Sequence, residues 1–160
     1  ALRARLASWE AHNGPVPVTG RSFPRRMGAF LWAQHHDRPG LEISDDICIM
    51  NFSADGCRIK RAVHVMQDYV EICDDVGLEK AHVVTWQLAP GWRVEQEGKN
   101  GFVCHHADSI PVHATLNGDA IEQWEIMEHE ASPHFRELMT SPAVRITFRG
   151  TLTTIWRKSG

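Results

Sequence analysis

The chain has 160 residues, 42% of them hydrophobic, which is enough for one core and too few for two. Its 17 Lys and Arg residues against 20 Asp and Glu residues give a formal net charge of -3, which disfavours a general electrostatic grip on nucleic acid or on an anionic membrane. No apolar run approaches the length of a membrane span, no signal-like apolar segment opens the chain, and the 4 Cys residues form no CxxC pair. We therefore expect a cytoplasmic protein with reduced thiols.

The N-terminal region is expected to form a short helix followed by an irregular arm. Leu2, Leu6 and Trp9 recur at helical spacing, which predicts an amphipathic helix over residues 2–12. The segment 14–26 that follows is rich in Pro and Gly, so it is predicted to be irregular.

A strand and a long helix are predicted next. Residues 47–52 are nearly all apolar, which is typical of a strand covered on both faces. Apolar side chains then recur at spacings of three and four residues, which predicts a helix over residues 58–76, capped by Asp55 and ended by Gly77. The apolar positions of this predicted helix are Ile59, Ala62, Val63, Met66, Val70 and Cys73.

Beyond Gly77, alternating apolar and polar residues predict short strands joined by tight turns, which together favour an antiparallel meander. A long final strand is predicted over residues 143–157, with a bend at Gly150. A final strand of this length often extends beyond its own sheet, so we expect a homodimer. The short predicted strands are residues 82–88, 92–97, 102–108 and 112–116.

A second helix is predicted over residues 119–139. Asp119 and Glu122 stand in capping-box spacing at its start, and Pro133 is expected to stop or kink it. The apolar stripe of this predicted helix is Ile121, Trp124, Met127 and Ala131.

These elements predict an α+β fold, with an antiparallel sheet or half-barrel packed against two main helices at about residues 58–76 and 119–139. We expect one domain over residues 1–160. Within it, residues 1–40 would form the N-terminal helix and arm, and residues 41–160 the α+β core.

The segment 101–118 is the part of the chain richest in side chains that bind metals or move protons. If it is extended, Cys104, His106 and Asp108 point to one face. An H-x-D pair with a distant His is typical of a two-His-one-carboxylate iron site. The histidines available as the distant ligand are His113, His129 and His134. One hypothesis is therefore a metal-dependent enzyme in which His106, Asp108 and His113 hold iron or zinc.

A second interpretation of the same segment needs no metal. A histidine near Asp108 is suited to act as a general base, because its ordinary pKa lies close to physiological pH and the carboxylate would orient the ring. A purely structural interpretation also stands, in which the histidines are half-buried strand residues and Asp108 begins a turn. The candidate catalytic residues are His106, Asp108, His113 and His134.

Two motifs carry a resemblance to a known family. Residues 95–102 read EQEGKNGF before a predicted strand, and residues 128–135 read EHEASPHF on the predicted late helix. Together, over roughly residues 80–150, they resemble the antibiotic biosynthesis monooxygenase family of dimeric, ferredoxin-like α+β barrels. The resemblance implies a pocket for a flat aromatic substrate, oxidised by molecular oxygen without metal or flavin. The residues that it implies as the pocket lining are Trp86, Trp124, His129 and His134.

The leading functional hypothesis is a small-molecule enzyme that oxygenates or isomerises a flat aromatic or polyketide-like substrate with histidine assistance and without a cofactor. The alternatives are the metal-dependent enzyme with iron or zinc, and a non-catalytic ligand-binding or interaction domain that uses the 14–26 arm as a contact surface. No nucleic-acid or membrane partner is expected.

Overall fold

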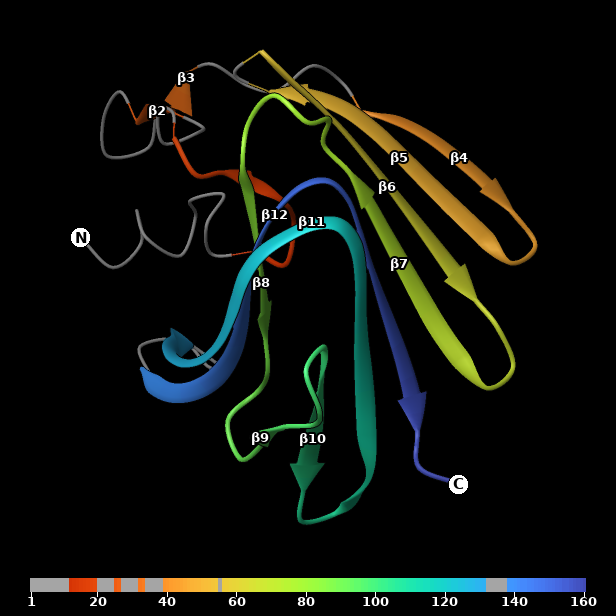
Figure 1. The fold of residues 1–160 in the computed structure, drawn as a ribbon, viewed down its shortest axis with the longest axis vertical. Helices are drawn as coiled ribbons and strands as arrows, with labels where there is room; N and C mark the ends of the chain where they lie inside the picture. Colours follow the sequence, from red (N-terminus) through yellow and green to blue (C-terminus); the bar gives the residue numbers. More distant parts are fainter. Residues whose placement is uncertain (1–11, 20–24, 27–31, 34–38, 55, 132–137) are drawn as a thin grey trace.

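All regular elements that the computed structural model describes are β-strands. It describes residues 12–19, 25–26, 32–33, 39–54, 56–131 and 138–160 (Figure 1). The strands are β1 (Val16–Pro17), β2 (Arg25–Arg26), β3 (Trp32–Ala33), β4 (Gly40–Ser44), β5 (Ile47–Ala54), β6 (Cys57–Val65), β7 (Tyr69–Asp75), β8 (His82–Gln87), β9 (Arg93–Gln96), β10 (Gly101–His106), β11 (Ser109–Ala131) and β12 (Met139–Lys158).

Ten of these strands form one antiparallel sheet, and β2 and β3 form a separate pair. The main path through the large sheet is β4-β5-β6-β7-β12-β11-β10-β9, and β8 joins it by pairing with β12 on one side and β1 on the other. The predicted α+β class and the ferredoxin-like barrel are therefore wrong, since the described part of the chain is all-β.

The helix predicted over residues 58–76 is instead the hairpin β6–β7, which reverses at residues 66–68. The apolar side chains fit a period of two once the reversal is included, and Val63 on β6 pairs with Ile72 on β7. Three of the six positions assigned to a helical stripe are β-branched, among them Ile59 and Val63, and β-branched residues favour strands. The apolar residues recur every three or four positions because the segment contains two strands and the turn that joins them.

The second predicted helix, over residues 119–139, is wrong where it can be compared, because residues 119–131 belong to β11. A register shift falls between Ile121 and Gln123, so that Ile121 pairs with Phe148 while Trp124 pairs with Ile146. The extra residue of this bulge puts two side chains three positions apart on one face, which is also the spacing of a helix.

The expected strands are confirmed in position, although the full cover expected for residues 47–52 is wrong: β5 is half-buried. The N-terminal helix predicted over residues 2–12 lies outside the described ranges except for residue 12, which is in a bend. The short strands β1 and β2 are the regular elements described within the predicted arm. The described chain contains no helix with the length and hydrophobicity needed to cross a membrane.

The core lies between two layers made by the bent hairpin β11–β12. The first half of β12 pairs with β8 and its second half pairs with β7, and Gly150, with φ 68°, stands at the change of partner. Ile59 of β6 and Trp86 of β8 belong to one buried cluster. Figure 1 shows β8 and β7 beside opposite arms of the bent β12. A chain of rings crosses the interior: Trp86 to Trp156 at 5.7 Å, Trp156 to Phe102 at 5.4 Å and Phe102 to Trp124 at 6.2 Å between centroids.

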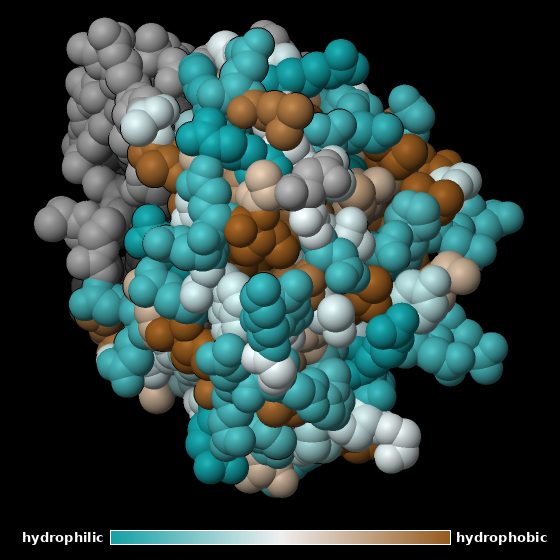
Figure 2. Space-filling view, viewed as in Figure 1, coloured by the Kyte–Doolittle hydropathy of each residue, from teal (hydrophilic) through white to brown (hydrophobic). Residues whose placement is uncertain are grey.

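Apolar side chains also remain exposed at the β4 edge of the sheet. Leu41 is 59% exposed and Ile43 is 73% exposed. Figure 2 shows hydrophilic side chains over most of the viewed face, with hydrophobic patches among them. The sheet therefore buries its apolar surface unevenly, with the dense packing near β12.

Candidate functional site

A cleft of about 340 Å³ lies where β1 passes beside β8, on the side of the sheet that faces away from the core. Along β8, Val84 and Trp86 point into the core, so Thr85 and Gln87 point outward. Alternation does the same on β12, where Ile146 is buried and Arg145 is exposed. The polar residues that line the cleft are His12, Thr85, Gln87, His129 and Arg145.

His129 forms one wall of the cleft and is held through both ring nitrogens. Its Nδ1 lies 3.1 Å from the carbonyl oxygen of Glu130, and its Nε2 lies 2.8 Å from Oγ of Ser141. Since a carbonyl only accepts, Nδ1 carries the proton in the neutral ring and Nε2 accepts from the Ser141 hydroxyl. Burial lowers the pKa of His129, so the ring is neutral at neutral pH.

Arg145 supplies the cleft with a positive charge. In the strand register it stands opposite Thr85 of β8 and Glu125 of β11. No carboxylate in the described ranges lies within ion-pair distance of its guanidinium. A guanidinium offers five donors in a planar fork, which suits carboxylate and sulfate groups. The cleft therefore combines one exposed cation with neutral hydrogen-bonding groups.

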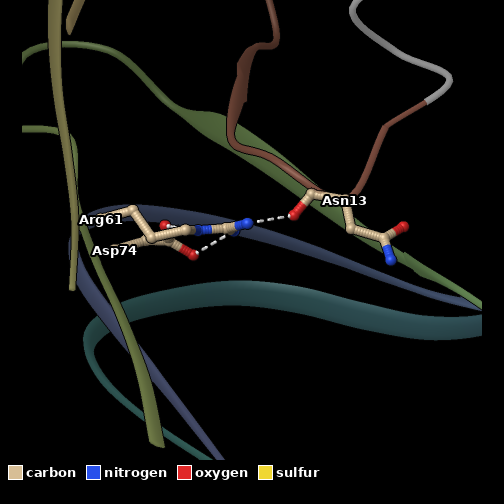
Figure 3. A network of polar contacts seen from close by, with 3 residues as sticks. All are labelled: Asn13, Arg61 and Asp74. Carbon is tan, nitrogen blue, oxygen red and sulfur yellow. Dashed lines mark hydrogen bonds and ion pairs between the residues drawn. The ribbon is translucent and has the colours of Figure 1, made fainter. Parts of the chain in front are cut away.

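The second wall, residues 12–18, is fastened to the sheet by a polar network (Figure 3). Arg61 donates from Nη1 to the carbonyl oxygen of Asn13 at 2.6 Å. The backbone N–H of Gln87 donates to Oδ1 of Asn13 at 3.1 Å, and that of Val18 donates to the carbonyl of Ala81 at 2.9 Å. These contacts place the backbone beside β8 and so determine the width of the cleft.

Arg61 itself is fixed by Asp74. Two hydrogen bonds join them, from Nε to Oδ1 at 2.6 Å and from Nη2 to Oδ2 at 2.8 Å, and the guanidinium lies over the Trp86 ring at 5.2 Å. Sequence reasoning missed this pair because a helix over residues 58–76 would not place the two residues opposite each other. Their places on two facing strands, Arg61 opposite Asp74, become visible only with the hairpin register.

The histidine-rich segment is divided between the two faces of the sheet. His106 packs on Trp92 with 5.3 Å between ring centroids, and its Nδ1 accepts the backbone N–H of Asp108 at 3.2 Å. Cys104 points into the core, and burial raises the pKa of its thiol to about 11. His113 pairs with Val103, one position out of step with Cys104, so its side chain points to the opposite face.

His113 instead forms a small surface network. Its Nδ1 lies 2.8 Å from Oε2 of Glu97, and its Nε2 lies 2.8 Å from Oγ of Ser159. The structure therefore does not bring His113 together with His106 and Asp108. Within the described ranges no group of three or more His, Cys, Asp or Glu side chains is placed to hold a metal ion.

The remaining predicted site residues have separate places. Trp86 is 5% exposed and packs in the core, and Trp124 donates from Nε1 to the carbonyl of Lys99 at 3.1 Å. His134 lies outside the described residues. Of the predicted pocket lining, His129 is the member that borders the outer cleft.

The fold and the cleft define a class of structure, an antiparallel β-sheet folded over its own core with a polar, positively charged cleft on its outer face. No protein-family model matches the chain, and no curated protein matches it. Solved structures do match: the heparan sulfate lyase HepC from Pedobacter heparinus superposes with TM-score 0.69 at 14% identity, over 99% of this chain and 26% of that one. A heparinase III matches with TM-score 0.58 at 14% identity, over 76% of this chain and 21% of that one.

These likenesses concern the fold. The chain spans about a quarter of the length of the HepC chain. They correct the resemblance to the antibiotic biosynthesis monooxygenases, because those proteins are α+β barrels while this chain shares an all-β fold with the two lyases. The oxygenase hypothesis depended on that resemblance, so it is withdrawn.

Proposed function

We propose that this chain is the β-sheet part of a polysaccharide lyase and that its outer cleft binds an acidic polysaccharide. The observation that carries the proposal is the likeness to HepC, which extends over 99% of the chain with TM-score 0.69. The cleft has a polar lining, and Arg145 has no carboxylate partner within ion-pair distance in the described part of the chain. Both features support the same class of ligand, because acidic sugars combine anionic groups with many hydroxyls.

The side chains of the cleft suggest a division of roles. Arg145 would bind a carboxylate or sulfate group of the sugar, and Thr85 and Gln87 would hydrogen-bond its hydroxyl groups. Both ring nitrogens of His129 are already engaged, by Glu130 and Ser141, so we assign His129 to shaping the cleft and leave proton transfer to other groups. In a lyase reaction a base removes the proton next to the uronate carboxylate, a C=C bond forms, and the glycosidic C–O bond breaks with a proton going to the leaving oxygen.

The test is binding of a heparan sulfate oligosaccharide, measured by calorimetry on the wild-type chain and on Arg145→Gln. We expect the substitution to weaken binding on the order of tenfold, because one charge-assisted contact is lost. Arg93→Gln is the matched control: Arg93 is an exposed arginine on β9, away from the cleft, and its loss should leave the affinity within about twofold.

Catalysis is followed separately, by the ultraviolet absorbance of the unsaturated uronate that a lyase releases. Equal affinity for a neutral polysaccharide, or an affinity that Arg145→Gln leaves unchanged, would contradict the proposed site. A product that lacks the double bond would contradict the reaction class.

A further inference from the structure

A second and larger cleft, of about 600 Å³, opens at the other end of β8. It lies between the turn that joins β5 to β6 and the connection from β7 to β8, both at the top of Figure 1. Gly56 and Gly77, with φ 73° and 72°, form these two turns, and a Cβ on either would meet no atom within 4 Å.

Three cations border this cleft: Arg58, Lys60 and Lys80. All three are exposed, and none forms an ion pair with a carboxylate in the part of the chain that the structure describes. Asp75 and Glu79 also line the cleft, but Asp75 already accepts the backbone N–H of Gly77 at 3.2 Å. Among the described residues, the charged lining has a net excess of one positive charge, three cations against two anions. This charge favours an anionic ligand.

His82 lines the cleft, and one of its ring nitrogens has no hydrogen-bond partner among the described atoms. The residue is 1% exposed, and its Nδ1 lies 3.0 Å from the carbonyl oxygen of Lys80. A carbonyl only accepts, so Nδ1 carries the proton, and burial lowers the pKa of His82, which keeps the ring neutral. Its Nε2 is then a lone-pair acceptor, buried and without a hydrogen-bond partner among the described atoms.

A buried acceptor without a donor is costly. Because Nε2 of His82 is closed to solvent, the contacts that the cleft offers a ligand are those of the cations at its rim, which suit an anionic group. Acidic sugars carry such a group.

We propose that this cleft is a second contact point for acidic sugars, in which Arg58 and Lys80 bind a sulfate or carboxylate group beside the ring of His82. The identity of the ligand rests on the proposed function, while the place and the contacts rest on this cleft alone. A long polysaccharide would then meet the sheet at two separated positions, which raises its apparent affinity through a second, intramolecular contact.

The experiment follows the imidazole resonances of His82 and His129 by NMR while a sulfated, uronate-containing disaccharide is added. A disaccharide is used because it reports each cleft separately. We expect saturable shifts of the His82 resonances, and the double variant Arg58→Gln/Lys80→Gln should weaken this response on the order of tenfold. Both positions are exposed, so the variant keeps the fold, and Lys158→Gln, an exposed lysine at the far end of β12, is the matched control that should change nothing.

The desulfated disaccharide and inorganic sulfate identify the anionic group. If both disaccharides bind, the carboxylate is the anionic group that the cleft recognises. If only the sulfated disaccharide binds and inorganic sulfate competes with it, the sulfate is that group. Either result supports the proposed contact point. Shifts at His129 with none at His82 would overturn this proposal and leave the proposed function standing. Shifts at His82 with none at His129 would support it and count against the first cleft. No shift at either histidine, or equal binding of a neutral disaccharide, would overturn this proposal and the proposed function together.

Discussion

The guanidinium of Arg61 joins parts of the chain that are far apart in sequence. It holds Asp74 through two hydrogen bonds, covers the ring of Trp86, and donates to the backbone of Asn13. Asp74 is fully buried, and desolvation raises the pKa of its carboxyl although Arg61 opposes the shift. A buried pair of this kind contributes more to defining one arrangement than to net stability.

Removing one partner should therefore cost more than the pair contributes. We expect Asp74→Ala to lower the free energy of unfolding by about 3–5 kcal/mol, because the Arg61 side chain, 13% exposed, would be left without its counter-ion. Urea denaturation measures the change. Glu122→Ala is the matched control, since it breaks the exposed pair with Arg149 and should cost less than about 1 kcal/mol. Similar losses from both substitutions would contradict this account.

Cys104 should be chemically inert in the folded protein. Burial raises the pKa of its thiol to about 11 from an ordinary 9.0, which lowers the thiolate fraction roughly a hundredfold at a given pH. Cys48 and Cys73 are half-buried and serve as internal references. Alkylation followed by peptide mass spectrometry should label those two first and label Cys104 only when the protein unfolds. Labelling of Cys104 in native protein at the rate of Cys48 would refute the assignment.

The hairpin β11–β12 is the element on which the rest of the sheet is built. It provides partners for β7, β8 and β10, and its two strands pair from one end to the other with shifts near Gly118 and Gln123. The bend needs a close approach of backbones: a Cβ on Gly118 would lie 2.6 Å from the carbonyl oxygen of Thr151. Glycine is required at this position by contact with backbone, which cannot move aside as a flexible side chain would.

Gly118→Ala should therefore lower the free energy of unfolding by about 1–3 kcal/mol, although alanine reduces the entropy of the unfolded chain. Gly40→Ala is the control on another strand, where the added Cβ would meet Asn51 at an ordinary 3.9 Å, and it should change stability by less than about 0.5 kcal/mol. Thermal unfolding of both variants measures the difference. A loss no larger at Gly118 than at Gly40 would show that the bend tolerates a side chain.

Over the whole molecule, buried histidines make stability depend on pH. Burial lowers the pKa of both His82 and His129 below the ordinary 6.5, so the unfolded chain takes up protons that the folded chain does not. Stability is therefore greatest above pH 6.5 and falls as the pH drops through 6.5 toward the lowered values. The raised pKa of Asp74 acts in the opposite sense, in a pH window that extends upward from its ordinary value of 3.8.

We expect the urea midpoint to decrease between about pH 7 and pH 5, and the decrease to be smaller in His129→Gln, which removes one of the two groups. Denaturation at a series of pH values measures both slopes. His12→Gln is the control, a substitution at an exposed histidine. A midpoint that rises on acidification would contradict the sign of these shifts.

Residue patterns in the sequence determined where most strands lie, because a half-buried strand alternates every two residues whatever it packs against. Residues 82–88 and 143–157 were found in this way. The same pattern failed at residues 58–76 and 119–131, where a turn and a bulge moved apolar side chains to a spacing of three and four. Local periodicity cannot separate a helix from two strands joined by a turn, or from one strand with a bulge.

The candidate sites were decided by tertiary structure. His129 was named from the sequence, but its partner Ser141 and the neighbouring Arg145 come from another strand, and the wall at Asn13 comes from the far end of the chain. His82 drew no attention, since nothing local shows that its Nε2 is buried without a donor. The sequence by itself determined the composition, the positions of most strands and which polar side chains are present. Only the register and the bend of β11–β12 decided which of those groups meet, because contacts across a sheet depend on pairings between distant residues.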